Sequence, residues 1–264
     1  MRELMCLKEE EESKDLAPDS EIVLPEELPE NRHAMHRNAM TEIAYSEDWK
    51  RVCVAGWIKK PKDANHYRLY LWQTALIFAG MNAVLRGENA VLAHCSVLET
   101  ERCAVVLFGE SGMGKSTVSG RWRAQGGKCV SDDMALLDFS GEDRIRVRRM
   151  PTWSACREGT SKWNYPADEE LPLVCVLALG RSESGRDEIV PLSMAQYFAQ
   201  CYRSMFYWNL FYTESLPEAM KAKLTERIRQ FAEIVAKRFP PRALLTVLEG
   251  EELRAVIENN LKTH

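Results

Sequence analysis

Apolar residues recur along the chain in short runs typical of strands, separated by longer stretches with helical spacing. We expect strands at 52–58, 91–98, 103–108, 129–131 and 135–139, with 135–139 joined to 144–149 in a hairpin. Helices are expected at 67–85 and 116–124. Glycines follow both helices and favour their ends, because glycine adopts the left-handed conformation at little cost.

The second half of the chain is expected to be richer in helix. Residues 173–179 form one continuous apolar run, which is typical of a strand buried on both faces. Helices are expected at 193–214 and 217–238, followed by a strand at 243–248 and a last helix from Glu251. Strands interleaved with helices predict an α/β fold, a mixed sheet with flanking helices and a helical C-terminal part.

The N-terminal segment differs from the rest in composition. Residues 1–45 are acidic and contain prolines, as in Glu9–Glu12 and Pro25–Glu30. Such a segment buries too little apolar surface to form a core, so we expect a flexible arm, with an edge strand near 22–24 as its only regular structure. The globular domain is expected to span residues 46–264.

Charge and cysteine content exclude several classes of protein. The net charge of −4 argues against binding to nucleic acid or to anionic membranes. The eight cysteines include no CxxC pair and several lie in apolar runs, which indicates buried free thiols in the cytoplasm. The N-terminus has no signal-peptide pattern, and the apolar stretch 67–85 is interrupted by Arg68, Gln73 and Asn82, so a buried helix is expected there.

The strongest motif is the run Gly-Glu-Ser-Gly-Met-Gly-Lys-Ser at 109–116, which fits GxxxxGK[ST] between a strand and a helix. Glycines let the backbone amides wrap a phosphate, Lys115 can reach the β- and γ-phosphates of ATP, and the Ser116 hydroxyl can bind Mg²⁺. The residues expected to contact the nucleotide are Gly109, Glu110, Ser111, Gly112, Met113, Gly114, Lys115, Ser116 and Thr117.

Two further features narrow the range of reactions that the chain could catalyse. Asp132 and Asp133 end the strand that follows the helix, and His94 lies in the strand before the loop strand. Two carboxylates near a phosphate loop can divide the work, since one can bind Mg²⁺ while the other accepts a proton from an attacking hydroxyl. The alternatives are a polar turn for the acidic pair and a core position for the histidine.

The stretch from His94 through the loop and Gly126 to Ser131-Asp132-Asp133 resembles the catalytic domain of HPr kinase/phosphorylase. The resemblance implies a P-loop kinase-like fold. It also implies that Asp132 is the general base, that His94 assists Asp132, and that Asp133 and Ser116 hold magnesium. It covers residues 90–135, with Ser131 in place of the alanine of that family.

The resemblance has limits elsewhere in the chain. Arg157-Glu158-Gly159 is at best distantly similar to the family's Arg-Gly-Leu-Gly signature, and the acidic residues 1–45 are not expected to form the family's regulatory N-terminal domain. HPr itself is therefore not the expected substrate. Residues 151–154 and the helical C-terminal half look more similar to stand-alone HPr-kinase-related proteins associated with modified-peptide gene cassettes.

Other polar and aromatic groups have simpler interpretations. Arginines 144, 146, 148 and 149 alternate with apolar residues, which predicts a solvated strand face. Arg157, Lys162 and Trp163 lie in a loop that could close over a substrate. An aromatic cluster is expected in the core or in a contact between subunits of a homo-oligomer. It comprises Tyr202, Phe206, Tyr207, Trp208, Phe211 and Tyr212.

These observations predict an enzyme that transfers the γ-phosphoryl group of ATP, with Mg²⁺, to a serine or threonine hydroxyl of a peptide or protein. A small-molecule kinase is one alternative, since adenylylsulfate kinases also place an aspartate after the second strand. A regulatory scaffold that binds ATP without transferring phosphate is another.

Overall fold

The computed structural model describes four strands within residues 21–56, without their side chains, and then residues 89–141, 144–149, 170–213 and 218–262. Side chains of residues 208–213 are also outside the described part, and so is the helix expected at 67–85. No helix in the described segments is long and apolar enough to cross a membrane.

The first four strands form a small separate sheet in the order β1-β4-β3-β2. They are β1 (Glu21–Ile22), β2 (Arg32–Arg37), β3 (Thr41–Ser46) and β4 (Arg51–Gly56). The segment expected to be an arm thus contains strands, and β3 runs across the expected boundary between residues 45 and 46. The position of that boundary stays a prediction.

The main sheet has eight strands in the order β11-β12-β10-β6-β5-β8-β9, with β7 paired to β5. Its strands are β5 (Ala90–Thr100), β6 (Cys103–Phe108), β7 (Lys128–Ser131), β8 (Met134–Asp138), β9 (Arg146–Arg149), β10 (Glu170–Arg181), β11 (Glu188–Pro191) and β12 (Arg242–Thr246). Strand β6 runs parallel to β10 and antiparallel to β5, so the sheet is mixed, as the sequence predicts.

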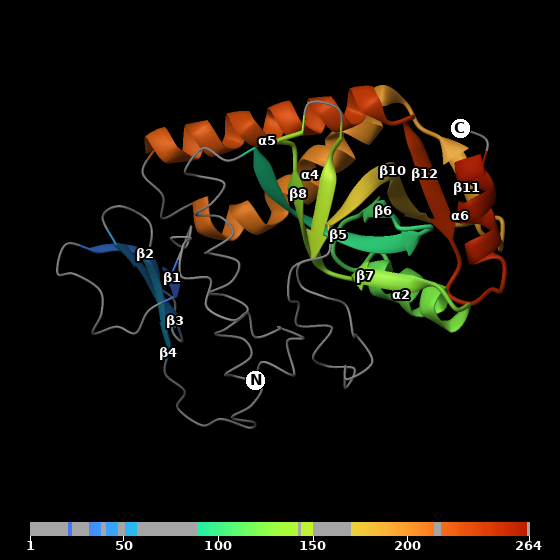
Figure 1. The fold of residues 1–264 in the computed structure, drawn as a ribbon, viewed down its shortest axis with the longest axis horizontal. Helices are drawn as coiled ribbons and strands as arrows, with labels where there is room; N and C mark the ends of the chain where they lie inside the picture. Colours follow the sequence, from blue (N-terminus) through green and yellow to red (C-terminus); the bar gives the residue numbers. More distant parts are fainter. Residues whose placement is uncertain are drawn as a thin grey trace.

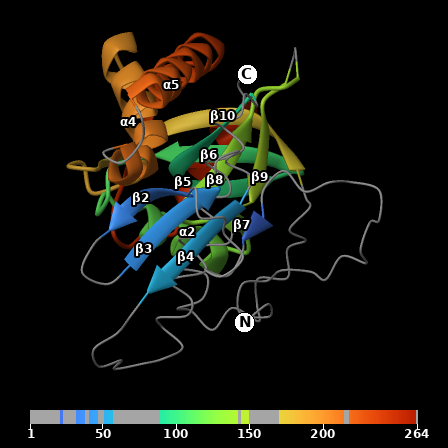
Figure 2. The ribbon, with the colours of Figure 1, turned by 90° about the vertical axis from the view of Figure 1, so that its left-hand side faces the viewer.

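Four helices pack on this sheet in the described part of the chain: α2 (Lys115–Ala124), α4 (Met194–Thr213), α5 (Glu218–Arg238) and α6 (Leu253–Lys262). Helices α4 and α5 lie on one side of the sheet and α2 on the other (Figures 1 and 2). In β6, Val106 and Phe108 join the core that contains α4 and α5, whereas Val105 and Leu107 join the core that contains α2 and α6. This alternation follows from the two-residue period of a strand and explains why the whole run is apolar.

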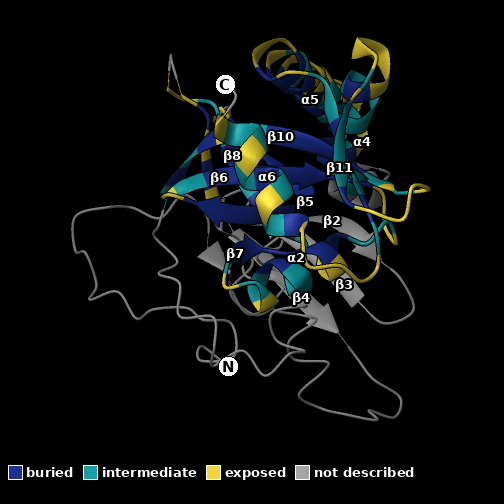
Figure 3. Ribbon diagram, turned by 90° about the vertical axis from the view of Figure 1, so that its right-hand side faces the viewer, coloured by how far each residue is buried: buried dark blue, intermediate teal, exposed yellow. Residues whose placement is uncertain are grey.

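The predicted elements are largely confirmed. The hairpin between β8 and β9 is present, and the two long helices begin and end within one residue of the expected bounds. Strand β11 was not expected; it pairs with β12 at the edge of the sheet. Strands β5 and β6 are almost entirely buried, while the edge strand β11 and the outer faces of α2 and α6 are more exposed (Figure 3).

Candidate functional site

The loop at 109–114 connects the end of β6 to the start of α2, and its glycines are required by its shape. Gly112 and Gly114 have φ angles of 81° and 96°, a region that side chains with a Cβ rarely adopt. At Gly109 the reason is contact, because a Cβ there would lie 3.2 Å from the Cβ of Leu179 in β10. The backbone can therefore turn tightly where the strand ends.

The start of α2 carries the positive end of the helix dipole. Its first turn contains no acidic residue, and the first amide groups of a helix have no partner within the helix. The side chains of Ser116 and Thr117 are exposed in this turn, as are Glu110, Ser111 and Gly112 in the loop. An anion could approach the amides and hydroxyls here from solvent.

Lys115 lies against the backbone of the same loop. Its Nζ donates hydrogen bonds to the carbonyl oxygens of Gly109 at 2.7 Å and Glu110 at 3.0 Å. Burial lowers the pKa of Lys115 to about 8, and the negative charges of Asp133 and Glu110 oppose that shift. The lysine is thus a charge held in a desolvated place, where an anion would raise its pKa again.

The acidic pair occupies a tight turn between β7 and β8. The Ser131 hydroxyl closes this turn, because it donates to the Met134 carbonyl at 2.5 Å and accepts from the Met134 N–H at 3.3 Å. The neighbouring strand β5 holds the turn from the side. The Ser96 hydroxyl donates to the Asp132 carbonyl at 3.2 Å, and the Cys95 N–H donates to the Asp133 carbonyl at 3.1 Å.

The two carboxylates differ in exposure. Asp132 is 1% exposed, whereas the side chain of Asp133 is 20% exposed and its charge acts on Lys115. The turn that carries both aspartates therefore lies close enough to the glycine loop for the charge of Asp133 to act on Lys115, although 17 residues separate Asp132 from Lys115 in the sequence.

His94 is buried in β5 and is directly linked to Asp133. Its Nδ1 lies 3.0 Å from the Asp133 carbonyl oxygen and 3.4 Å from the Asp133 carboxylate. A carbonyl oxygen can only accept, so Nδ1 carries the hydrogen in this contact. The sequence-based expectation linked His94 to Asp132; these contacts link it to the second aspartate and to the backbone of the turn.

An aromatic ring from helix α4 also contacts the candidate site. Tyr207 of α4 stacks on the His94 ring, with the centroids 4.3 Å apart and the planes at 20°. Tyr207 belongs to the aromatic cluster that is expected in the core or in a subunit contact, and the ring that it meets is that of the buried His94. Tyr202 and Phe206 do pack against the core, and the side chains of the other three lie outside the described part.

Two further sequence-based expectations concern the arginines in and before β9 and the loop that follows that strand. In β9 and the residue before it, Ile145 and Val147 are buried and the arginines at 144, 146 and 148 are exposed, which confirms a solvated face. Arg146 and Arg148 form ion pairs with Glu170. The loop that contains Arg157, Lys162 and Trp163 lies outside the described residues, as do residues 151–154.

The described residues contain no group of three His, Cys, Asp or Glu side chains arranged to hold a metal. The Ser116 hydroxyl and the Asp133 carboxylate are two of the oxygen groups near the loop, beside those of Glu110, Ser111 and Thr117. Such a set suits a cation that takes most of its other ligands from phosphate and water rather than from protein, which is the usual behaviour of Mg²⁺. Of the five described cysteines, Cys95, Cys129 and Cys201 are buried, as expected, and Cys103 and Cys175 are partly exposed.

Comparison with known proteins places the chain in a family. A search of curated proteins finds no match. A solved structure, the Hpr(Ser) kinase/phosphatase from Coxiella burnetii, matches with 16% identity and a TM-score of 0.28, over 39% of this chain and 70% of that chain. The sequence model of the SynChlorMet cassette protein ScmC matches residues 53–262, which is most of the 264-residue chain and agrees with the predicted link to a gene cassette. The chain therefore belongs to the family of the SynChlorMet cassette protein ScmC.

Proposed function

We propose that this protein is an ATP-dependent kinase that binds magnesium-ATP at residues 109–116 and transfers the γ-phosphoryl group to a hydroxyl, most readily that of a serine or threonine in a peptide or protein. The observation that carries this proposal is the placement of the Asp132-Asp133 turn beside a glycine loop that opens a helix. A loop alone would support binding, and the adjacent carboxylates add groups suited to phosphoryl transfer.

The loop would hold the phosphates of ATP through its amides and the positive end of α2. Lys115 would turn from the carbonyls of Gly109 and Glu110 to the β- and γ-phosphates. The attraction between its ammonium group and the phosphates would be stronger there, because burial has removed part of the water that otherwise screens the charge.

Ser116 and Asp133 would hold the magnesium ion. Both provide oxygen ligands, and the partial exposure of Asp133 leaves room for phosphate oxygens and water to complete the ion's shell. When bound, Mg²⁺ neutralises charge on the phosphates during transfer.

Asp132 would act as the general base. The acceptor oxygen would form a bond to the γ-phosphorus while the bond between that phosphorus and the β–γ bridging oxygen breaks, ADP leaves, and the acceptor proton passes to Asp132. His94 would assist by positioning the turn that carries both aspartates, through its contact with Asp133.

The test is to compare two asparagine variants in the full-length protein. Asp132→Asn should bind magnesium-ATP nearly as the wild type does but transfer phosphate about 10²–10⁴ times more slowly, the usual contribution of a positioned general base. Asp133→Asn should instead raise the Mg²⁺ concentration needed for binding. Calorimetry gives the affinities, and slow ATP hydrolysis gives the rate until an acceptor is known.

Asp138→Asn serves as the matched control, because Asp138 is a carboxylate at the far end of β8 that pairs with Arg148. It should leave both quantities unchanged. If the Asp132 and Asp133 variants behave like this control, the acidic turn has no part in catalysis and the kinase assignment fails, even where ATP still binds.

A further inference from the structure

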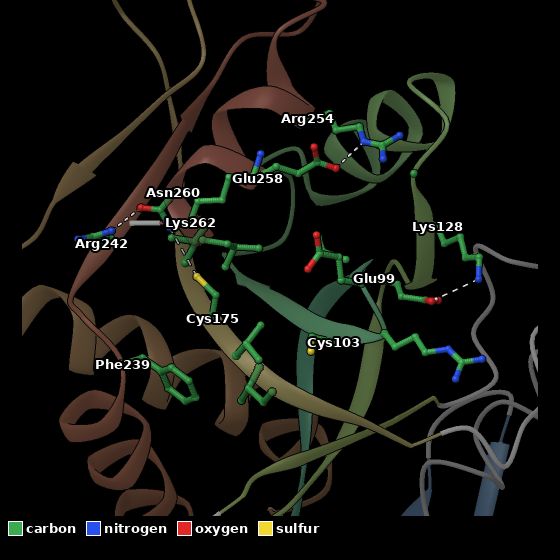
Figure 4. Close-up of a pocket in the computed structure, with 18 of the residues that line it drawn as sticks. Glu99, Cys103, Lys128, Cys175, Phe239, Arg242, Arg254, Glu258, Asn260 and Lys262 are labelled. Carbon is green, nitrogen blue, oxygen red and sulfur yellow. Dashed lines mark hydrogen bonds and ion pairs between the residues drawn. The ribbon is translucent and has the colours of Figure 1, made fainter. Parts of the chain in front are cut away.

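A groove of about 1100 Å³ lies at the other end of β6, away from the phosphate loop (Figure 4). The turn between β5 and β6, the end of α2, the start of β10, the connection from α5 to β12 and the last turns of α6 all line it. Ordinary ligand pockets hold about 300–1000 Å³ and enclose a small molecule. A space at or beyond the upper end of that range suits an extended segment better.

The groove carries an excess of positive charge in a protein that is negative as a whole. Its basic residues are Arg102, Lys128, Arg238, Arg242, Arg254 and Lys262. Its acidic residues are Glu99, Glu101 and Glu258.

Two of these carboxylates are already neutralised within the groove. Lys128 pairs with Glu99 at 3.3 Å, and Arg254 pairs with Glu258 at 2.6 Å. Among the described residues, the four other cations have no carboxylate partner, and Arg242 donates to the side-chain amide of Asn260 instead. Against the single remaining carboxylate, Glu101, these four leave a surplus of three positive charges, although the chain as a whole has a net charge of −4.

The groove also has an apolar floor between its charged walls. Leu173, Leu177, Phe239 and Leu261 line it, and Val174 is 43% exposed there. Val174 lies at a register shift between Leu173 and Cys175, near the start of β10, where the pairing with β6 is interrupted. An occupant that presents apolar side chains between acidic ones would cover this floor and meet the cations at the same time.

The turn between β5 and β6, at the rim of the groove, has a strained backbone and carries the cation Arg102. Glu101 and Arg102 have φ angles of 47° and 63°, and they are the two central residues between the paired Thr100 and Cys103. Positive φ at both positions is normally met by Asn-Gly or a similar pair. Residues held in such conformations cluster at functional sites. The tight turn thus retains Arg102 where glycine would be the favoured residue.

We infer that this groove binds an acidic peptide segment, one in which acidic side chains are interspersed with apolar ones, from a partner protein. Nucleic acid fits less well, because it needs a broad basic surface and offers no apolar side chains to the floor. The inference does not depend on phosphoryl transfer, since the groove and the loop are separated by the length of β6, roughly 17 Å.

The test uses the full-length protein and a fluorescein-labelled 12-residue peptide of glutamate and leucine, followed by anisotropy without nucleotide. The wild type should bind it, and binding should weaken as salt rises. The triple variant Arg102→Glu/Arg238→Glu/Lys262→Glu should bind about tenfold or more weakly. A matched triple variant away from the groove, Arg181→Glu/Arg186→Glu/Lys223→Glu, changes the net charge equally and should bind as the wild type does.

Equal loss in both triple variants would overturn the inference, since the effect would then be one of net charge. Equal binding of a lysine–leucine peptide would overturn it as well. So would tighter binding of a single-stranded oligonucleotide that the groove variant abolishes, or a wild-type dimer that dissociates only in the groove variant, because the occupant would then be nucleic acid or a second copy.

A second variant separates binding from folding. Arg102→Gly should raise the Tm, because glycine is favoured at its φ of 63°, and should at the same time weaken binding of the acidic peptide, because one unpartnered cation of the groove is lost. If the Tm rises and peptide affinity stays unchanged, Arg102 does not contact the peptide and the strained turn does not serve this groove.

Discussion

The two ends of β6 differ in how the sequence builds them. At the C-terminal end, the phosphate loop is one continuous run, 109–116, and most of its properties come from local backbone geometry. At the N-terminal end, the groove is lined by residues between 99 and 262 that only the fold brings together. The first can be recognised from a motif, whereas the second needs a structure. Helix α2 touches both, since it begins at the loop and ends at the groove.

The largest effect should come from breaking the anchor that fixes α2 between the two ends. Arg121 binds the buried Asp187 through both NH groups and also donates to the carbonyls of Val247 and Gly250. Arg121→Ala leaves Asp187 buried without its cation, and such a loss costs about 3–5 kcal/mol of unfolding free energy. Urea unfolding measures it. Arg229→Ala, which removes exposed ion pairs on α5, should change stability little, and comparable losses would show that Arg121 is no special anchor.

A smaller effect should appear at the groove end of α2. A Cβ on Gly127 would lie 2.2 Å from Nε1 of the buried Trp122, which donates to the Lys128 carbonyl. Gly127→Ala should therefore cost about 1–3 kcal/mol, as overpacking usually does, without changing ATP affinity.

The control for this variant lies on the same helix. Gly120 has no atom within 4 Å of an added Cβ, so Gly120→Ala should stabilise the protein by about 0.5–1 kcal/mol. Thermal unfolding of both variants decides the matter: a Gly127 variant as stable as the wild type would mean that Trp122 moves freely.

A change in pH should separate the two sites. The pKa of Lys115 is about 8, so the lysine is charged below that pH and neutral above it, and ATP affinity should fall about tenfold from pH 7 to pH 9. Peptide affinity should change less, because three of the four groove cations without a carboxylate partner are arginines that stay charged. Lys115→Arg should remove the pH dependence of ATP binding. A wild-type affinity that is flat with pH would show that the charge on Lys115 does not matter.

Much of the fold could be predicted because its core elements are local patterns. The apolar run at 103–108 predicts a strand, and the helical spacing at 193–214 and 217–238 predicts the two long helices. Strand β11 escaped prediction because it is a four-residue edge strand with one charged residue and Pro191, and its pairing with β12 arises only in the folded protein.

In the candidate site, too, the local motifs could be predicted from the sequence and the long-range contacts could not. The loop and the acidic turn are short motifs, so sequence could locate them, and the closure of the turn by Ser131 uses neighbours only three residues apart. The stacking of Tyr207 on His94 joins residues from α4 and β5, and no local pattern distinguishes that tyrosine from its aromatic neighbours. The link from His94 to Asp133 instead of Asp132 likewise depends on the register between β5 and β8.

The most direct test of the account is a calorimetric titration of magnesium-ATP into the wild type, Lys115→Ala and the surface control Lys223→Ala. The wild type and the control should bind alike, and Lys115→Ala should bind at least about tenfold more weakly, because a charge-assisted contact worth about 1.5–3 kcal/mol has gone. Equal affinity of all three proteins would contradict the claim that residues 109–116 form a nucleotide site.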